Sequence, residues 1–428
     1  MELEIGRRGP LRGELTVPAD KSISHRTVIL GALARGQSLV KNLSHGEDIK
    51  STVRCLRQLG VEIIQERGIT RIRGRGFAGM TESGDVLNCG NSGTTMRLLS
   101  GVAATRPFLT VLTGDDSLRQ RPMARVVEPL QMMGATIYGR NNSRSAPLAI
   151  LGGELQGIEY RLKVASAQVK SAILLAALQA RGETVIYEEN PSRDHTERML
   201  RELGVNLELS YGKIRLQGPC ELTPMEWTIP GDISSAAFWL VAATIVPGSE
   251  ILVRDVGVNP TRAGILQVLQ SMGAEIHCQD CRTIGGEPVA DLLAKHSGLR
   301  PVDIGGSIIP SLIDEIPVLA IAMAMADGTS VVRDAAELRT KESDRIAMIV
   351  ASLNRMGVQT EETEHGFVVY GKGRIPGNKR VSSGGDHRIA MASAIAGLVS
   401  DLPVTIEGFD CVGISYPTFL EDLYHLVS

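Results

Sequence analysis

Long hydrophobic runs, abundant aromatic residues and a marked excess of charge are all missing from this chain of 428 residues. Aromatic residues make up 4% and the formal net charge is −3, so no general attraction to nucleic acid or to a membrane surface is expected. The longest apolar stretches, such as Ala236 to Val246, are too short to span a bilayer and are typical of buried helices. The opening MELEIGRRGP has no apolar core of a signal peptide, so we expect a cytoplasmic location.

Paired cysteine motifs are also scarce. Only one CxxC segment is present, CQDC from Cys278 to Cys281, with His277 beside it. A structural zinc site needs four ligands, and no second pair completes the set. We therefore expect no metal, no cofactor and mostly reduced thiols. The six cysteines are Cys55, Cys89, Cys220, Cys278, Cys281 and Cys411.

What the chain does contain is a pattern repeated six times. A length of 428 residues already predicts at least two domains. One recurring unit is an Ala-rich apolar helix followed by a turn and a β-rich run, and between the copies lies an amphipathic helix ending in Leu-Gly or Met-Gly. Those glycines recur at intervals of roughly 70 to 85 residues, which indicates a few large α/β units rather than a short tandem array. The six copies of the unit with the Ala-rich helix read SISHRTVILGALARGQSLVKN, SGTTMRLLSGVAATRPFLTVL, SAQVKSAILLAALQARGETVIYE, ISSAAFWLVAATIVPGSEILVRD, EIPVLAIAMAMADGTSVVRD and HRIAMASAIAGLVSDLPVTIEG.

Two similar segments mark the domain boundary, TVPADKSIS (16–24) and TIPGDISSA (228–236). Each reads as a strand end, a proline, a turn and a helix N-cap. They predict one lobe of three units over residues 21–228 and a second lobe over residues 229–428, completed by residues 1–20. Two lobes joined by two crossing segments imply a cleft between them. The terminal FLEDLYHLVS is expected to be a sixth amphipathic helix without a following strand.

Charged and polar residues gather where these helices begin. Lys21, Ser22 and Arg26 open the first helix, although cations at a helix N-terminus oppose its dipole. CGNSGTTMR offers backbone N–H groups near Gly93, and RQRPM places Arg121 before a proline, where an extended backbone is favoured. ELRTKESDR is predicted to carry Lys341 and Arg345 on one helix face, with Glu342 alongside. The remaining candidates are Ser166, Gln168, Asp314, Glu315, Asp386, His387 and Arg388.

Helix N-termini, glycine turns and guanidinium groups together bind phosphate and carboxylate. Each segment alone also has an ordinary interpretation, because a charge run is usually a solvated helix face and a Ser-Gly pair is usually a cap. Their recurrence at equivalent positions of the repeat favours a shared site for several anionic groups.

The same segments carry a resemblance to a known family. DKSISHR, GNSGTTMR, RPM, SAQVKSA, RDHTE, IDEIP, KESDR and DHRIAM stand in an order that closely resembles the 5-enolpyruvylshikimate-3-phosphate (EPSP) synthase family over nearly the full length. The resemblance implies an α/β fold of two domains, an inverse α/β barrel (α/β prism) with six βαβαββ pseudo-repeats, three per domain. It also implies an active site in the interdomain cleft, a monomer, and no cofactor.

The resemblance further implies a transferase. The enolpyruvyl group of phosphoenolpyruvate passes to the 5-hydroxyl of shikimate 3-phosphate, through a tetrahedral intermediate, and phosphate leaves. Asp314, Glu342 and Lys21 are the implied catalytic residues. The implied shikimate 3-phosphate contacts are Lys21, Ser22, Arg26, Ser166, Gln168, Arg193, Asp314 and Lys341. The implied phosphoenolpyruvate contacts are Lys21, Gly93, Arg121, Gln168, Arg345, His387 and Arg388.

Four positions depart from the family's usual pattern. Ala19 stands where the family usually has glycine, and Ala167 stands where some members have a second serine, so one hydroxyl is absent. Arg193 stands near the position where other members use an aromatic contact, and Ile414 stands in the region where some members place a lysine. Gly93 is the position that decides room for the inhibitor glyphosate, so the resemblance predicts sensitivity.

Two other functions remain as alternatives. One is the related enolpyruvyl transferase that acts on UDP-N-acetylglucosamine, which typically uses a loop cysteine; TGDDSLRQRPM has none. The other is a non-catalytic anion-binding relative. Retention of Asp314 and Glu342 beside the cations argues against it, because buried carboxylates add nothing to anion binding.

Overall fold

The fold comes from a computed structural model that describes residues 1–66, 68–210 and 212–427. The chain divides into two compact units. The N-terminal unit consists of Ala19–Ile229 with Thr283–Glu287, and the C-terminal unit consists of Met1–Pro18, Pro230–Arg282 and Pro288–Ser428. The short segment Thr283–Glu287 was not anticipated from the sequence.

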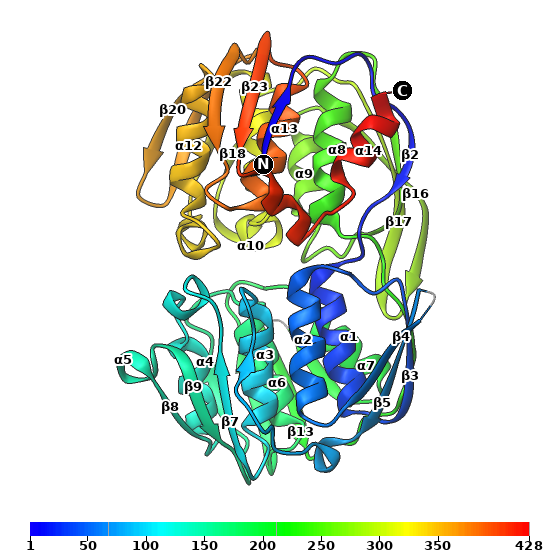
Figure 1. The fold of residues 1–428 in the computed structure, drawn as a ribbon, viewed down its shortest axis with the longest axis vertical. Helices are drawn as coiled ribbons and strands as arrows, with labels where there is room; N and C mark the ends of the chain where they lie inside the picture. Colours follow the sequence, from blue (N-terminus) through cyan, green and yellow to red (C-terminus); the bar gives the residue numbers. More distant parts are fainter. Residues whose placement is uncertain (67, 211, 428) are drawn as a thin grey trace. The chain divides into compact units, whose positions relative to one another are not determined.

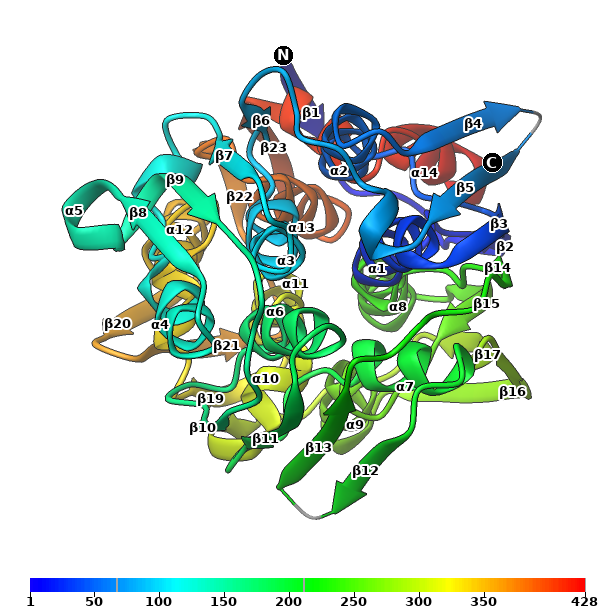
Figure 2. The ribbon, with the colours of Figure 1, turned by 90° about the horizontal axis from the view of Figure 1, so that it is seen from below.

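Three four-stranded sheets form the walls of the N-terminal unit, and Figure 2 shows them around the helices. In each sheet the first pair of strands is parallel and the others are antiparallel. Their orders are β14 (Glu226–Thr228), β3 (Arg35–Lys41), β5 (Ile69–Arg75), β4 (Glu62–Glu66); β6 (Leu87–Asn88), β7 (Leu109–Thr113), β9 (Ser145–Leu151), β8 (Thr136–Gly139); and β10 (Glu159–Arg161), β11 (Gly182–Tyr187), β13 (Lys213–Gly218), β12 (Leu207–Ser210).

Two kinds of helix fill this unit. The Ala-rich helices α1 (Lys21–Leu33), α3 (Gly93–Ala103) and α6 (Ala167–Ala177) are buried on nearly all sides, as helices apolar all round must be. The amphipathic helices α2 (Glu47–Gln58), α4 (Ala124–Met132) and α7 (His195–Glu202) bury one face each. The short elements are η1 (Phe77–Gly79), η2 (Leu118–Gln120) and α5 (Arg140–Ser143).

The C-terminal unit repeats this plan (Figure 1). Its sheets run β16 (Glu275–Ile284), β17 (Glu287–Lys295), β15 (Glu250–Gly257), β2 (Arg12–Thr16); β18 (Asp303–Ile304), β19 (Asp327–Val332), β21 (Gly366–Lys372), β20 (Gln359–Thr363); and β1 (Glu2–Ile5), β23 (Leu402–Glu407), β22 (Gly377–Ser382). Its helices are α8 (Ile233–Ile245), α9 (Gly264–Ser271), α10 (Ile309–Leu312), α11 (Ile316–Met325), α12 (Arg345–Arg355), α13 (His387–Gly397) and α14 (Phe419–Val427), with η3 (Gly306–Ile308), η4 (Ala336–Thr340) and η5 (Phe409–Ile414).

The predicted repeats are confirmed. Each Ala-rich copy forms a helix and a strand, and the described part of FLEDLYHLVS forms α14 (Phe419–Val427). The glycines after the amphipathic helices adopt the expected left-handed conformation: Gly60, Gly134, Gly204, Gly273 and Gly357 have φ between 82° and 112°.

The apolar stretch singled out in the sequence forms α8, in which every residue from Ile233 to Ile245 is buried. Over the three described ranges, no single helix is long and apolar enough to cross a membrane; the segment Gly306–Leu312 and α11 reach that length and hydropathy only as a sharply bent pair.

Candidate functional site

In the N-terminal unit, the start of α1 carries two cations held in different ways. Asp20 caps the helix by accepting a hydrogen bond from the Ile23 backbone N–H at 2.8 Å. Lys21, partly exposed, lies 3.2 Å from an Asp48 carboxylate oxygen. Arg26 is buried, and burial lowers its pKa to about 10, which leaves it charged at neutral pH.

The Arg26 guanidinium is oriented by neighbours from three helices. It donates to Ser171 Oγ at 2.8 Å, to Thr196 Oγ1 at 2.7 Å and to the Ser22 carbonyl at 2.9 Å. Ser171 and Thr196 were missed in the sequence, since only the fold brings α6 and α7 beside α1. These neutral partners hold the group without cancelling its charge.

His25, which precedes Arg26 in the sequence, has a different role. Its ring is fully buried and its Nδ1 lies 2.7 Å from Thr52 Oγ1. Burial lowers its pKa to about 3, so the ring is neutral at physiological pH and acts as a core residue.

A second group of cations lies at the start of α3. Gly93 is the first residue of the helix, after the Ser92 cap, and a Cβ atom there would lie 3.4 Å from guanidinium nitrogens of both Arg97 and Arg121. As predicted, Arg121 is extended before its proline, with φ −68° and ψ 144°. Its Nη2 donates to Asn91 Oδ1 at 2.6 Å.

Gln168 joins this group from α6. Its Oε1 accepts a hydrogen bond from Arg97 Nη1, and its Nε2 donates to Thr94 Oγ1 at 2.8 Å. Arg97 was missed as a site residue, although its place at the end of GNSGTTMR, four residues after Gly93, was a usable signal. Ser166 caps α6.

In the C-terminal unit, Arg345 is the centre of the charged cluster. It is the first residue of α12 and is 1% exposed. Its guanidinium contacts Glu342 Oε2 at 2.6 Å, Asp386 Oδ2 at 2.8 Å and Asp314 Oδ1 at 3.2 Å. Burial acts to lower its pKa, but the carboxylates of Glu342, Asp386 and Asp314 together raise it well above the ordinary value.

Asp386 ties this cluster to α13. Besides pairing with Arg345, it caps the helix by accepting a hydrogen bond from the Arg388 backbone N–H at 3.0 Å. Burial acts to raise its pKa, yet Arg345 holds the pKa below its usual value. The Arg388 side chain is buried and donates to the Asp314 carbonyl at 3.1 Å, while His387, the first residue of α13, is buried beside it.

One local prediction is wrong. Lys341 and Arg345 do not share a helix face, because α12 begins only at Arg345 and Lys341 lies in an extended segment after η4. Lys341 nevertheless lies in the same cluster, with its Nζ 3.5 Å from Asp314 Oδ1. Ile414, at the end of η5, packs partly buried against the core.

Taken unit by unit, the structure gathers the predicted residues, together with Arg97, into two groups. The first group lies at the helix N-termini of the N-terminal unit and is held there by hydrogen bonds: Ser22, Arg26, Arg97, Arg121 and Gln168. Lys21 and Ser166 stand at the starts of α1 and α6, and Arg193 stands two residues before α7. Asp314, Lys341, Glu342, Arg345, Asp386 and Arg388 form one contact network in the C-terminal unit. The first group is rich in cations, and the second pairs cations with carboxylates.

The described His, Cys, Asp and Glu side chains are not grouped as metal ligands. Among residues 1–66, 68–210 and 212–427, no group of three or more His, Cys, Asp or Glu side chains is arranged to hold a metal ion. Cys278 and Cys281 are free thiols on exposed positions of β16.

Comparison with known proteins identifies the family. Residues 5–423 match the family model described as EPSP synthase (3-phosphoshikimate 1-carboxyvinyltransferase). The chain belongs to the EPSP synthase family.

Curated relatives agree with this membership. The chain is 52% identical to a protein of Syntrophomonas wolfei over 98% of both chains, and 48% identical to one of Bacillus subtilis over 97% of both; each is named 3-phosphoshikimate 1-carboxyvinyltransferase. An EPSP synthase structure from Acinetobacter baumannii is 43% identical, with a TM-score of 0.89 over 99% of this chain and 98% of that one. The predicted fold class and transferase class are confirmed, and the UDP-N-acetylglucosamine alternative is not favoured.

Proposed function

We propose that this chain transfers the enolpyruvyl group of phosphoenolpyruvate to the 5-hydroxyl of shikimate 3-phosphate, releasing phosphate. The observation that carries the proposal is the C-terminal cluster, where Asp314 and Glu342 both contact a buried Arg345. An enzyme that adds a hydroxyl across an enol double bond needs carboxylates for proton transfer and cations for the developing charge. Membership of the family supplies the reaction class.

The reaction requires two balanced steps. In the addition, the substrate hydroxyl oxygen bonds to C2 of phosphoenolpyruvate, its proton passes to a base, and a proton from an acid reaches C3. In the elimination, the C2–O bond to phosphate breaks and a proton leaves C3, which restores the double bond. We assign Asp314 as the base for the hydroxyl and Glu342 as the proton donor to C3, with Lys21 assisting phosphate departure.

The cations have the task of holding two anions together. Like charges about 4 Å apart repel by roughly 4 kcal/mol at an effective dielectric near 20, so both substrates must be compensated. We assign Ser22, Arg26, Ser166, Gln168, Arg193 and Lys341 to shikimate 3-phosphate. We assign Gly93, Arg121, Arg345, His387 and Arg388 to phosphoenolpyruvate, with Lys21 and Gln168 serving both.

We further propose that both groups of residues serve one active site, in a cleft between a lobe of residues 21–228 and a lobe of residues 229–428 with 1–20. Closure of the lobes would exclude water and complete the site. We expect the working form to be a cytoplasmic monomer.

Glyphosate sensitivity is part of the proposal. A methyl group at Gly93 would lie 3.4 Å from the guanidinium nitrogens of Arg97 and Arg121, in van der Waals contact with both, and would take up space beside them. We expect wild-type inhibition by glyphosate that competes with phosphoenolpyruvate, and at least about tenfold weaker inhibition of Gly93→Ala. A wild-type inhibition curve that stays flat to high glyphosate, with normal phosphoenolpyruvate saturation, would contradict this.

Substrate choice tests the proposed function. Phosphate release should require phosphoenolpyruvate together with shikimate 3-phosphate, and UDP-N-acetylglucosamine should not replace the latter. Turnover with the sugar nucleotide alone would overturn the assignment, and binding of both anions without turnover would indicate a non-catalytic relative.

A further inference from the structure

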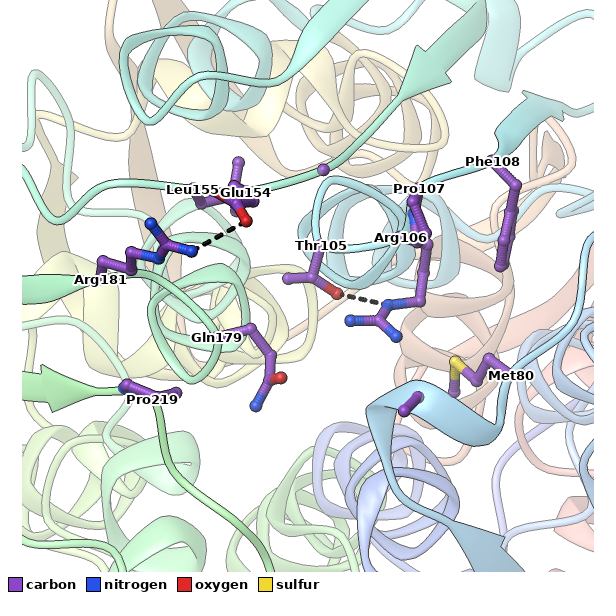
Figure 3. A pocket seen from close by; sticks show the side chains of 12 residues that line it. Met80, Thr105, Arg106, Pro107, Phe108, Glu154, Leu155, Gln179, Arg181 and Pro219 are labelled. Carbon is purple, nitrogen blue, oxygen red and sulfur yellow. Dashed lines mark hydrogen bonds and ion pairs between the residues drawn. The ribbon is translucent and has the colours of Figure 1, made fainter.

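A pocket of about 480 Å³ lies in the N-terminal unit, at the end of α3 and α6 away from Gly93 and Ser166 (Figure 3). It is lined by the loops that follow α3, β9, α6 and β13, together with η1. Eleven residues of α3 separate this end from the helix start, a distance of about 16 Å. The volume suits a small organic ligand, and none of the proposed site residues lines it.

The pocket wall combines apolar side chains with one buried cation and, at an exposed edge, with the Arg181–Glu154 ion pair. Met80, Phe108 and Leu155 contribute hydrophobic side chains, and Arg106 contributes its guanidinium (Figure 3). Arg106 is 9% exposed. Its Nε donates to Thr105 Oγ1 at 3.0 Å and its Nη1 donates to the Phe77 carbonyl.

No carboxylate among the described residues pairs with Arg106, and burial lowers its pKa. The hydrogen bonds of the Arg106 side chain do not go to the carbonyls that end α3. The last carbonyls of α3 and its cap are taken by backbone donors: Val102 O by Thr105 N, Ala103 O by Arg106 N and Ala104 O by Gly153 N. A buried cation with only neutral partners is costly unless an anion joins it.

The internal repeat shows how two other arginines near a helix end are compensated. Arg35 and Arg181 occupy the same place in the first and third repeats, three residues before Ser38 and Thr184 of the equivalent strands. In the second repeat that place belongs to Pro107, three residues before Thr110, and Arg106 is the residue before it. Arg35 pairs with Glu221 at 3.2 Å and Arg181 pairs with Glu154 at 2.8 Å, both in exposed positions. Arg106 alone of the three is buried and lacks such a partner.

The equivalent backbone hydrogen bonds of the repeats show that Gly79 stands where the neighbouring repeat carries Glu154. Thr81 N donates to Leu59 O, and Gln156 N donates in the same way to Met133 O, so the residue two before Thr81 corresponds to Glu154. A side chain at position 79 is excluded, because its Cβ would lie 2.2 Å from Arg75 Cβ. The missing carboxylate therefore cannot be supplied from that position.

We propose that this pocket binds a small organic carboxylate with an apolar body. The carboxylate pairs with Arg106, as Glu221 pairs with Arg35 and Glu154 pairs with Arg181. The apolar body lies against Met80, Phe108 and Leu155. The amide of Gln179, whose Nε2 already donates to the carbonyls of Leu178 and Cys220, presents its oxygen as an acceptor for a ligand hydroxyl or amine.

Calorimetric titration of the full chain with phenylacetate, 3-phenylpropionate and hexanoate tests the proposal, with phenylacetamide as an uncharged isostere. We expect at least one carboxylate to bind with a Kd of about 1 mM or tighter, and phenylacetamide to bind at least about tenfold more weakly. Failure of all three carboxylates to bind, or equal binding of acid and amide, would overturn it.

Two variants locate the binding. Gly153→Trp adds a large side chain at a residue that lines the pocket and whose Cβ would meet nothing within 4 Å, so we expect it to occupy the pocket. Arg106→Gln removes the charge. Both should weaken binding at least about tenfold. Arg35→Gln, at an exposed arginine that does not line the pocket, and Gly298→Trp, at an equally open glycine of the C-terminal unit, should leave it unchanged. Wild-type affinity in Gly153→Trp would overturn the proposal, and that variant decides alone if Arg106→Gln does not fold.

Discussion

At the scale of single residues, the charged groups of the two clusters are held in opposite ways. Arg26 donates its hydrogen bonds to hydroxyl and carbonyl oxygens, and the carboxylates of Glu197 and Asp20 act on it only through space, so its guanidinium is not paired within the site. Arg345 is surrounded by carboxylates, so its charge is largely compensated and its orientation is fixed. The first arrangement suits binding of a phosphate, and the second suits positioning of the two carboxylates that we assign to proton transfer.

Arg26→Lys tests the first arrangement. A lysine keeps the charge but cannot donate to Ser171, Thr196 and a substrate oxygen in the planar geometry of a guanidinium. We expect the KM for shikimate 3-phosphate to rise at least about tenfold, with the melting temperature within a few degrees of wild type. An unchanged KM would show that Arg26 serves only the packing of α1.

Asp386→Asn tests the second arrangement through stability. Removing one partner of a buried ion pair should lower the free energy of unfolding by about 3 kcal/mol at pH 7. Because the pKa of Asp386 lies below its usual value in the folded state, its stabilisation is present above about pH 4 and is lost as pH falls through the folded pKa. Urea unfolding from pH 7 to pH 3 should show the two proteins converging.

Asp401→Asn is the matched control for this experiment, since Asp401 pairs with Arg374 on the surface. It should change the free energy of unfolding by less than about 0.5 kcal/mol. A wild-type minus Asp386→Asn difference that grows as the pH falls would contradict the account.

At the scale of elements, close helix packing brings together the N-termini of α3 and α6, which carry proposed site residues. Gly101 lets α3 approach α6, because a Cβ there would lie 2.3 Å from the Ala172 carbonyl oxygen. This approach places Arg97, one turn into α3, against Gln168, the second residue of α6. The position of the site therefore depends on a backbone contact about one turn further along α3.

Gly101→Ala should consequently destabilise the protein by about 2 kcal/mol despite the better helix propensity of alanine, and it should also lower turnover. Gly31→Ala on α1 is the comparison, since the three atoms nearest to its Cβ would all belong to the Ile72 side chain, the first at 3.1 Å. A side chain has more freedom to shift than a backbone carbonyl. Unfolding midpoints of the two variants check this, and equal midpoints would contradict it.

Helix boundaries at the site were largely predictable, whereas side-chain partners were not. Asp20, Ser92, Ser166 and Asp386 are caps because their side chains satisfy the first backbone N–H groups, a rule that acts over three residues. The pairing of Arg26 with Thr196 spans 170 residues, and no local rule contains it. The error at Lys341 arose because a charge pattern with helical spacing continues across a segment that is not helical.

At the scale of the whole molecule, the sixfold repeat explains how one chain places so many helix starts bearing polar groups. Each copy is an Ala-rich helix that cannot be buried alone, so three copies share one core per unit. The repeat was readable from the sequence because it is written in periodic apolar residues. The assignment of Thr283–Glu287 to the N-terminal unit could not be read from the sequence. It depends on contacts such as that of Glu287 with His195, at 2.8 Å, which joins residues 92 positions apart.

The central claim is that cations from both units hold one pair of anionic substrates. The most direct test is a crystal structure of the chain with shikimate 3-phosphate and glyphosate bound. The account predicts that Lys21 and Arg121 of the N-terminal unit and Lys341 and Arg388 of the C-terminal unit all contact the same pair of ligands. Ligands held by one unit alone, with the other unit's cations in solvent, would contradict it.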